Sequence, residues 1–362
     1  MMTFILFILM IGVLIAFHEL GHMLVAKLFN VYVREFAIGF GPKIFSKQGK
    51  ETLYSLRLIP LGGYTGMIES EEENNLTDQQ EGQNEQIVIP RERTFYGVNP
   101  WKRICILIAG PLFNLLLASL IFVTIFEVNP QKVVYPKAVV ASIMENSPAM
   151  QAGLQKDDKI IMVEYSNGDK INVDTTYDLL INNQLHKGAY TVTVIRDGLE
   201  KEISVTPAYD EELKEYVIGV TFAGQAQLVK MNFGEAFVQG IKSTGQSVAL
   251  TIKSILMLFT GNVGLESVSG TIGMYSYTQE AISYGFLSYL SLVGSISISL
   301  AVMNLIPIPV FDGGRVVLTI VEMIIGHRIN KKVENIILYI GMGLIFALFI
   351  LTTVSDLTKL FN

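Results

Sequence analysis

The 362-residue sequence has few of the residues that build redox and metal sites in soluble proteins, with one cysteine and four histidines. A single cysteine, Cys105, excludes a disulfide framework and a zinc site made of several thiolates. Charged residues are also scarce, at 17%, and the net charge of -6 gives no indication of nucleic acid as a partner. Hydrophobic residues make up 50% of the chain and the mean hydropathy is +0.43, which is typical of a membrane protein.

Four apolar segments are long enough to cross a bilayer, which takes about 20 residues. They are 3–28, 103–127, 286–308 and 336–354. Residues 1–17 lack the basic start and the small-residue cleavage pattern of a signal peptide, so we expect a retained span. A weaker segment, 245–260, is short and carries Lys253, which favours an interfacial or packed amphipathic helix.

The loop charges predict how the chain crosses the membrane. Lysine and arginine gather between the first and second predicted spans, and again between the third and fourth, so the positive-inside rule places both loops in the cytoplasm. The segment 129–240 and both termini are then expected outside the cytoplasm. The charges of this long segment are left out of the count, because long loops translocate largely regardless of charge.

The spans and the composition between them divide the chain into four parts. Residues 1–128 and 286–362 are predicted as the two parts of a membrane domain, and the first part contains a β-rich loop over 31–66 and an acidic loop over 69–86. Residues 129–210 are predicted as a soluble extracytoplasmic module, and 211–285 as a linker with the amphipathic helix. The acidic loop contains no basic residue, which favours a solvated or disordered segment over a binding site. The module alternates strand-like runs with turns, and helices are expected to start near Ser147-Pro148 and Thr175.

His18, Glu19 and His22 lie within the first predicted span. On a helix, histidines four residues apart place both imidazoles on one face, where they can share a metal ion. Glu19 lies beside them in the pattern of zinc metalloproteases, where it acts as the general base. The alternative is a pair of helix histidines satisfied by hydrogen bonds, but three ionisable groups in a span are costly unless they have a function.

Zinc in a catalytic site takes a third protein ligand and keeps one position open. We predict Asp312, because the third span runs in the same direction as the first and Asp312 terminates it, behind Pro307 and Pro309, which break the helix. The alternative is a helix-stop carboxylate at the interface. The other carboxylates considered are worse placed, at the opposite face or in loops and flanks: Glu127, Glu35 and Glu322.

The position of His18 sets the depth of the predicted site. The fifteen residues that separate Thr3 from His18 span roughly 22 Å of helix against a hydrocarbon core of about 30 Å. The site is therefore expected inside the membrane, nearer the cytoplasmic face. Two neutral histidines, one aspartate and Zn²⁺ carry a net charge of +1, which an ionised Glu19 cancels, as suits a site of low dielectric constant.

The predicted chemistry is hydrolysis of a peptide bond. Zinc lowers the pKa of its water and polarises the scissile carbonyl, while Glu19 takes the water proton and delivers it to the leaving amine. Asn304 lies two turns before Asp312, where its amide can hold the substrate backbone or the oxyanion. An interhelical hydrogen bond of Asn304 is an equally open interpretation.

Several motifs in this order resemble the site-2 protease family of intramembrane metalloproteases. They are His18-Glu19-Leu20-Gly21-His22; Gly39-Phe40-Gly41-Pro42 and Pro60-Leu61-Gly62-Gly63-Tyr64, similar to its membrane-associated β-hairpin; Ala109-Gly110-Pro111-Leu112-Phe113-Asn114; and the Asn-x-x-Pro-x-Pro-x-x-Asp-Gly arrangement from Asn304. Residues 139–163, with Ser147-Pro148-Ala149 and Ala152-Gly153-Leu154, resemble a PDZ domain. The order and spacing are similar to those of the bacterial type that cleaves anti-sigma factors.

The resemblance implies a multi-pass α-helical membrane protein with four transmembrane helices, a membrane-associated β-hairpin region and an inserted α+β PDZ domain. It implies regulated intramembrane proteolysis, in which a single-span substrate such as an anti-sigma factor or a signal-peptide remnant is cut in the bilayer after another protease has cut it first. By the same resemblance His18, His22 and Asp312 bind Zn²⁺, Glu19 is catalytic and Asn304 assists substrate binding.

The sequence departs from the family at three points. There is room for one PDZ domain where some relatives have two; Lys156-Asp157-Asp158 replaces the usual Pro-Gly-Asp, which bears on peptide binding by that domain; and Phe311 replaces the usual leucine before Asp312. Because a helical peptide hides its backbone, a strand edge in 36–64 can capture the unwound substrate by strand addition. The alternative is a hairpin that only packs against the spans.

Two other functions fit part of the pattern. A metal transporter would explain ionisable groups in a broken span, but no repeated halves are present. A PDZ-containing membrane scaffold would leave Glu19 without a role. The two further histidines, His186 and His327, are assigned to ordinary surface positions.

Overall fold

The computed structural model describes residues 2–69, 89–166, 168–183, 188–210, 215–260 and 268–361. The chain forms two compact units, one of Met1–Asn129 with Phe233–Asn362 and the other of Pro130–Asn232. We call the first the membrane unit and the second the inserted unit. The membrane unit is therefore built from both ends of the chain.

Among the described residues, four helices of the membrane unit are long and apolar enough to cross a bilayer. They are α1 (Met2–Leu28), α3 (Pro100–Val128), α8 (Phe286–Leu305) and α10 (Lys331–Phe361). The four predicted spans are thereby confirmed in number, although α8 ends three residues before the predicted limit at 308. The start of α3 follows from its sequence, because the Asn99 side chain accepts a hydrogen bond from the Trp101 amide and Pro100 occupies the first turn.

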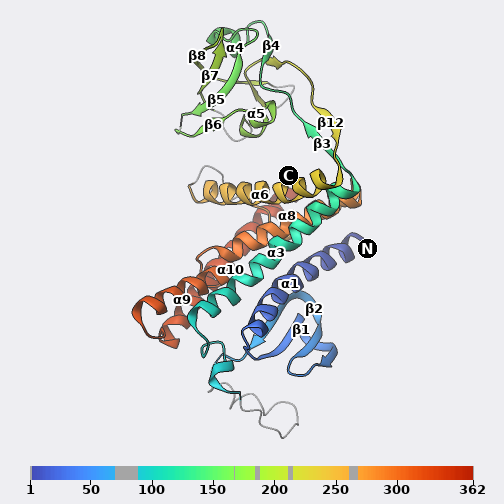
Figure 1. The fold of residues 1–362 in the computed structure, drawn as a ribbon, viewed down its shortest axis with the longest axis vertical. Helices are drawn as coiled ribbons and strands as arrows, with labels where there is room; N and C mark the ends of the chain where they lie inside the picture. The colour runs from blue at the N-terminus through green and yellow to red at the C-terminus, as the bar shows by residue number, and fades with distance from the viewer. Residues whose placement is uncertain are drawn as a thin grey trace. The chain divides into compact units, whose positions relative to one another are not determined.

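Helix α3 is the centre of the membrane unit and lies between α1 and α8 (Figure 1). Buried apolar side chains join the three helices, among them Met10, Leu14, Leu117, Ile121 and Val293. Small residues allow the closest approach, as expected where lipid removes the hydrophobic drive between helices. A Cβ atom on Gly21 of α1 would stand 2.4 Å from the Ala109 carbonyl oxygen of α3. Only glycine fits this crossing.

The segment after α8 is broken at the prolines, as predicted, but Asp312 lies on the other side of the break. The helix ends at Leu305, residues 306–311 form a turn that contains Pro307 and Pro309, and a separate helix, α9 (Asp312–Ile325), begins at Asp312. Asp312 therefore opens a new helix and does not terminate the third span, which corrects the prediction. The two prolines explain the difference, because neither can donate the backbone hydrogen bond that would continue α8.

In chain order, helices α6 (Phe233–Phe259) and α7 (Thr271–Ser283) precede α8. Helix α6 begins twelve residues before the predicted segment 245–260, so that segment is part of a 27-residue helix and is not short. Helix α7 contacts α8, α1 and α10. Its first turn is held by α10, where the carboxylate of Asp356 accepts a hydrogen bond of 2.8 Å from the Gly273 amide.

The loop between α1 and α3 is β-rich, as predicted. Strands β1 (Val33–Gln48) and β2 (Leu53–Met67) pair in antiparallel fashion, and each pairs twice. The first half of β1 contacts both ends of β2, as in the pairs Ala37 to Tyr64 and Ala37 to Ser55. The result is a curled sheet of four segments, which we call the curled sheet. A short 3-10 helix, η1 (Arg91–Arg93), leads on to α3.

The inserted unit contains a four-stranded antiparallel sheet in the order β6-β5-β7-β8. Its strands and helices are β3 (Gln131–Val134), β4 (Val140–Ile143), α4 (Pro148–Ala152), β5 (Lys159–Tyr165), β6 (Lys170–Asn172), α5 (Thr176–Asn183), β7 (Tyr190–Arg196), β8 (Leu199–Val205), β9 (Ala208–Asp210), β10 (Glu215–Val217), β11 (Val220–Phe222) and β12 (Gln227–Lys230). The predicted helix start is confirmed, since the Ser147 hydroxyl caps α4 and Pro148 occupies its first turn. Alternate apolar residues such as Ile160, Val163, Val192 and Val194 fill one core.

Some predictions fall on residues that the structure does not describe. The acidic loop over 69–86 lies outside the described residues apart from Glu69, which forms an ion pair of 3.3 Å with Arg315. His186 also lies outside them. His327 is exposed, as predicted, and its Nδ1 lies 3.1 Å from the Arg328 carbonyl oxygen.

Candidate metal centre

The two histidines of α1 face the same point. His18 and His22 are one helical turn apart, their rings meet edge to face with centroids 4.8 Å apart, and their Nε2 atoms are separated by 3.2 Å. His22 is buried and His18 is partly buried. The spacing of four residues on an unbroken helix is sufficient to explain this geometry.

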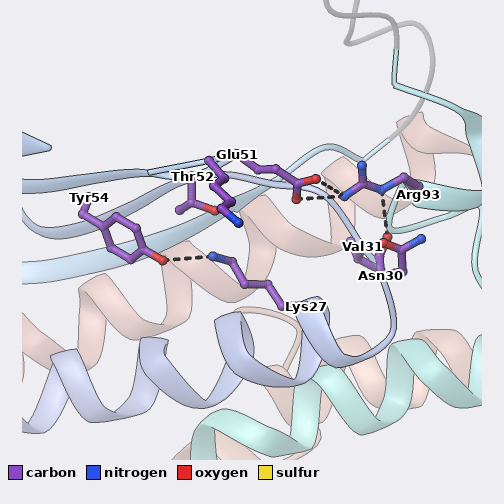
Figure 2. A pocket seen from close by; sticks show the side chains of 8 residues that line it. Lys27, Asn30, Val31, Glu51, Thr52, Tyr54 and Arg93 are labelled. Carbon is purple, nitrogen blue, oxygen red and sulfur yellow. Dashed lines mark hydrogen bonds and ion pairs between the residues drawn. The ribbon is translucent and has the colours of Figure 1, made fainter. Parts of the chain in front are cut away.

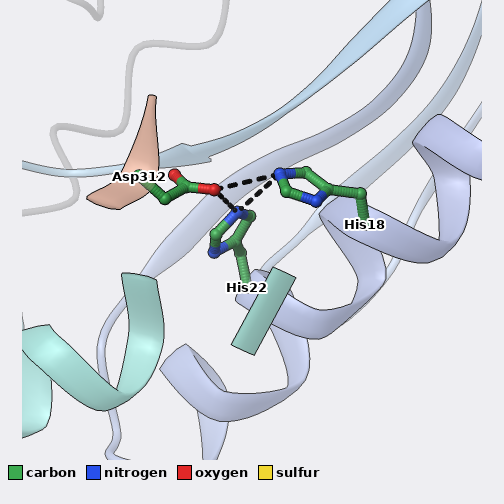
Figure 3. A group of neighbouring side chains, drawn as sticks. All are labelled: His18, His22 and Asp312. Atoms are coloured by element: carbon green, nitrogen blue, oxygen red, sulfur yellow. Dashed lines mark hydrogen bonds and ion pairs between the residues drawn. The ribbon is translucent and has the colours of Figure 1, made fainter. Parts of the chain in front are cut away.

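Asp312 reaches the same point from the other end of the chain. Its Oδ2 atom lies 3.1 Å from Nε2 of His18 and 3.3 Å from Nε2 of His22 (Figure 3). The turn before α9 folds tightly, since a Cβ atom on Gly313 would stand 2.3 Å from the Leu305 carbonyl oxygen. The glycine after Asp312 therefore permits the sharp return that aims its carboxylate at α1.

The three ligand atoms fit a tetrahedral metal. Zinc binds imidazole and carboxylate at about 2.0–2.2 Å, which places neighbouring ligands of a tetrahedron roughly 3.3–3.5 Å apart. The observed separations of 3.1, 3.2 and 3.3 Å form a nearly equilateral triangle of this size. Oδ2 of Asp312 is buried and accepts no hydrogen bond of normal geometry from the described residues. Three ligands and one open position are the arrangement of catalytic zinc.

Contacts behind the histidines orient their rings. Nδ1 of His22 lies 2.8 Å from the Ile106 carbonyl oxygen of α3, so Nδ1 carries the proton and Nε2 presents a lone pair. Nδ1 of His18 faces the side-chain amide of Asn114, at 3.5 Å. Helix α3 therefore fixes the imidazoles that α1 supplies.

Gly110 of α3 makes room for the centre. A Cβ atom at this position would stand 2.3 Å from Nε2 of His22 and 2.8 Å from Cε1 of His18. Any larger residue would push against both imidazoles. The glycine therefore sets how closely the second span approaches His18 and His22.

Glu19 lies between α1 and the curled sheet. A Cβ atom on Gly63 would stand 3.5 Å from Cγ of Glu19, and the Thr65 hydroxyl donates a hydrogen bond of 2.9 Å to the Glu19 carbonyl oxygen. The side chain is partly exposed. Strand β2 thus limits the positions that the Glu19 carboxylate can take. These contacts do not neutralise its charge.

A buried ionic cluster holds the curled sheet in shape. Glu35 accepts hydrogen bonds from Ser55 at 2.6 Å, from Tyr64 at 2.6 Å and from Arg57 at 2.8 Å. Burial alone would raise the pKa of the Glu35 carboxyl, but these three donors hold the pKa below its ordinary value. Burial and the bond to Glu35 raise the pKa of Tyr64 to about 12. The cluster stabilises the part of β2 that contacts Glu19.

The structure brings together three of the five predicted site residues, His18, His22 and Asp312. Glu19 follows His18 directly on α1. Asn304 lies in the last turn of α8 and is partly buried, and no hydrogen bond joins it to the other four among the described residues. Its role stays a prediction.

Two contacts of the histidines were not predicted from the sequence. They come from the side chain of Asn114 and from the backbone carbonyl of Ile106. Asn114 is 1% exposed and lies in the middle of a membrane-spanning helix, and a buried amide in a span is a signal that could have drawn attention to it. No sequence pattern marks a backbone carbonyl such as that of Ile106 as a partner of His22.

Comparison with known proteins agrees with this geometry. The family model of peptidase family M50 matches residues 6–348. The chain belongs to peptidase family M50. This is the site-2 protease family that the motifs resemble, and the chain is a zinc metalloprotease of the membrane.

Individual relatives cover almost all of the chain. Zinc metalloprotease RasP of Oceanobacillus iheyensis is 31% identical and is aligned over 100% of both chains. A protein of Clostridium acetobutylicum is 32% identical over 98% of this chain and 97% of its own. One of Staphylococcus aureus strain MSSA476 is 32% identical over 100% of this chain and 99% of its own. The names of the Clostridium and Staphylococcus proteins also contain the words zinc metalloprotease.

Proposed function

We propose that His18, His22 and Asp312 hold the catalytic zinc and that Glu19 is the general base for hydrolysis of a peptide bond inside the membrane. The observation that carries this proposal is the triangle of ligand atoms, with sides of 3.1 to 3.3 Å, between α1 and the start of α9. It joins residues almost 300 positions apart in a geometry that suits zinc and has no evident structural purpose.

The depth of the site supports cleavage within the bilayer. His18 is sixteen residues from the start of α1 and ten from its end, or roughly 24 Å and 15 Å along the helix. In a hydrocarbon core of about 30 Å, the ligands therefore lie below the membrane surface at which α1 ends. We infer from the loop charges that this surface is cytoplasmic and that both termini and the inserted unit are outside.

The residues of the site divide the chemistry between them. Bound zinc supplies Lewis acidity, which polarises the scissile carbonyl and makes the attacking water more acidic. Glu19 takes a proton from this water as its oxygen bonds to the carbonyl carbon. When the carbon–nitrogen bond breaks, Glu19 returns the proton to the leaving amine. Asn304 is proposed to hold the substrate backbone or the oxyanion near the end of α8.

The substrate class follows from the same position. A bond inside the bilayer belongs to a membrane-spanning segment, and we propose single-span proteins of the anti-sigma-factor type or signal-peptide remnants, first cut by another protease. Such a segment must unwind before it is cleaved, and a strand edge of the curled sheet, which packs on α1 beside Glu19, can pair with it by strand addition.

We assign the inserted unit as a PDZ domain. Its support is the four-stranded sheet with helices α4 and α5, together with the pairing of β11 with β4. The Lys156-Asp157-Asp158 segment, which differs from the usual Pro-Gly-Asp, is fixed in the fold. Asp158 is fully buried and forms an ion pair of 2.6 Å with Arg196. That pair stabilises the fold of the unit.

The test is the exchange of Glu19→Gln in the full-length protein. We expect zinc to be retained, because Glu19 is not a ligand, and cleavage of a single-span substrate in liposomes to fall by roughly 10²–10⁴-fold, as for loss of a general base. The matched control is Glu280→Gln on the exposed face of α7, which should cleave at the wild-type rate. Wild-type cleavage by Glu19→Gln would refute the assignment, and so would wild-type protein that contains no zinc.

A further inference from the structure

A second polar site lies where α1 leaves the membrane. A cavity of about 410 Å³ opens between the last turn of α1, the turn that joins β1 to β2, and η1 (Figure 2). Its lining residues are Lys27, Asn30, Val31, Lys50, Glu51, Thr52, Tyr54 and Arg93. We call it the α1-end pocket. Its volume is within the range of pockets that hold small ligands.

Positive charge predominates in the α1-end pocket. Lys27, Lys50 and Arg93 line it, and Glu51 is its one carboxylate. Arg93 and Glu51 neutralise each other, since one guanidinium nitrogen contacts both carboxylate oxygens at 2.9 Å (Figure 2). Two lysines then remain, so the pocket carries a net charge of about +2 toward whatever occupies it.

The two lysines have donors to spare. Nζ of Lys27 donates to the Tyr54 hydroxyl at 2.9 Å, which uses one of its three protons and aims the ammonium group across the pocket (Figure 2). Lys50 is exposed in the turn and makes no ion pair with the residues that the structure describes. Together with the Tyr54 hydroxyl, these ammonium groups offer several donors to an anion with several acceptor oxygens, such as a phosphate.

The surroundings indicate that this phosphate belongs to a lipid. Lys27 lies in the last turn of a membrane-spanning helix, which is the level of the headgroups. Leu24 and Leu28 flank it on α1 with 44% and 77% of their surface exposed, so apolar contact is available beside the charge. A free phosphate or an acidic peptide would have no use for these leucines. Basic pockets beside membrane helices are suited to anionic headgroups.

We propose that the α1-end pocket binds the phosphate headgroup of an anionic phospholipid, with Lys27 and Lys50 as the charged ligands. The bound lipid would hold the end of α1 against the curled sheet. Its ligand Lys27 lies on the same helix as His18, nine residues further along. The proposal requires α1 to span the membrane, but it is independent of the protease mechanism.

The test is a native mass spectrometry titration of the full-length protein in detergent with phosphatidylglycerol and, in parallel, with phosphatidylcholine. We expect wild type to bind phosphatidylglycerol more tightly, and each of Lys27→Gln and Lys50→Gln to weaken this first binding event by about fivefold. The double variant should lose roughly 25-fold. Lys332→Gln at the start of α10 removes the same charge outside the pocket and should change binding by less than about twofold.

Other outcomes would overturn the proposal. Equal binding by the double variant and wild type would exclude the pocket, and an equal loss in Lys332→Gln would reduce the effect to general surface charge. Displacement of the lipid by an equal concentration of inorganic phosphate would assign a free anion, and tighter binding of an acidic peptide would assign a protein. Because Lys50 lies in an exposed turn, the single variant Lys50→Gln tests the pocket even if a change at Lys27 disturbs α1.

Discussion

The two carboxylates of α9 lie at opposite ends of one helix and have different partners. Glu322 is 9% exposed and receives a hydrogen bond of 2.7 Å from the buried guanidinium of Arg103 and another of 3.0 Å from the Ile329 amide. Asp312 faces the Nε2 atoms of His18 and His22, with no positively charged partner of fixed protonation among the described residues.

This difference separates a structural carboxylate from the carboxylate that we propose as a metal ligand. At Glu322 the chain supplies the opposite charge, so the pair is complete within the protein. At Asp312 a carboxylate and two imidazole nitrogens converge on one point, and since Nδ1 of His22 donates to the Ile106 carbonyl, Nε2 of that ring has a lone pair to offer. The carboxylate oxygen of Asp312 lies 3.3 Å from this lone pair, and the two repel one another unless a cation or a proton lies between them.

The largest expected effect comes from Asp312→Asn. The amide keeps the size of the side chain but loses the charge that binds zinc, so we expect zinc content to fall well below one ion per chain and kcat/KM to fall by more than about 10³-fold. The thermal midpoint of the zinc-free protein should match that of wild type stripped by a chelator. Full zinc content in Asp312→Asn would show that the triangle is not the metal site.

Glu322→Gln should have the opposite profile. It leaves Arg103 buried without an anion, which costs about 3 kcal/mol in the free energy of unfolding, while zinc stays bound. The double variant Arg103→Met/Glu322→Met should recover most of this stability, because it removes both charges. Zinc loss in Glu322→Gln that matches the loss in Asp312→Asn would erase the distinction between the two ends of α9.

A smaller effect is expected from Asn114→Ala. The Oδ1 atom of Asn114 is buried and has no hydrogen-bond partner among the residues that the structure describes. Rotation of the amide by 180° would let it accept the proton of His18 Nδ1. Loss of such a contact behind a metal ligand typically weakens metal affinity about tenfold. The measurement is competition for zinc with a chelator of known affinity. Asn99→Ala, which removes the cap of α3, is the control and should leave zinc affinity unchanged even though it lowers stability.

The parts of the site that sequence could predict are local or chemically rare. The spacing of four positions from His18 to His22 determines a shared helix face, and length and composition determine four apolar helices. Asp312 could be proposed because the first and third spans run in the same direction, so that the end of the third lies at the depth of the histidines. These arguments need only the helical repeat and the cost of charge in lipid.

The parts that sequence could not predict depend on contacts between distant segments. The ion pair of Arg103 and Glu322 joins positions 219 residues apart. No local sequence pattern around either residue predicts its partner. The double pairing of β1 and β2 needs a curl of the whole sheet, which alternation of apolar residues does not encode. The two prolines predict the break between α8 and α9. Whether Asp312 ends the first helix or begins the second depends on the turn between them, which the sequence does not determine.

The discontinuous membrane unit has a consequence for how the protein can be assembled. Of the three residues proposed to hold zinc, His18 and His22 lie before the inserted unit and Asp312 lies after it. The proposed metal ion would therefore connect two separate stretches of the membrane unit. A backbone cut within the inserted unit would leave these stretches linked by helix packing and by the ion. A site built in this way is complete only when both stretches of the membrane unit have packed together.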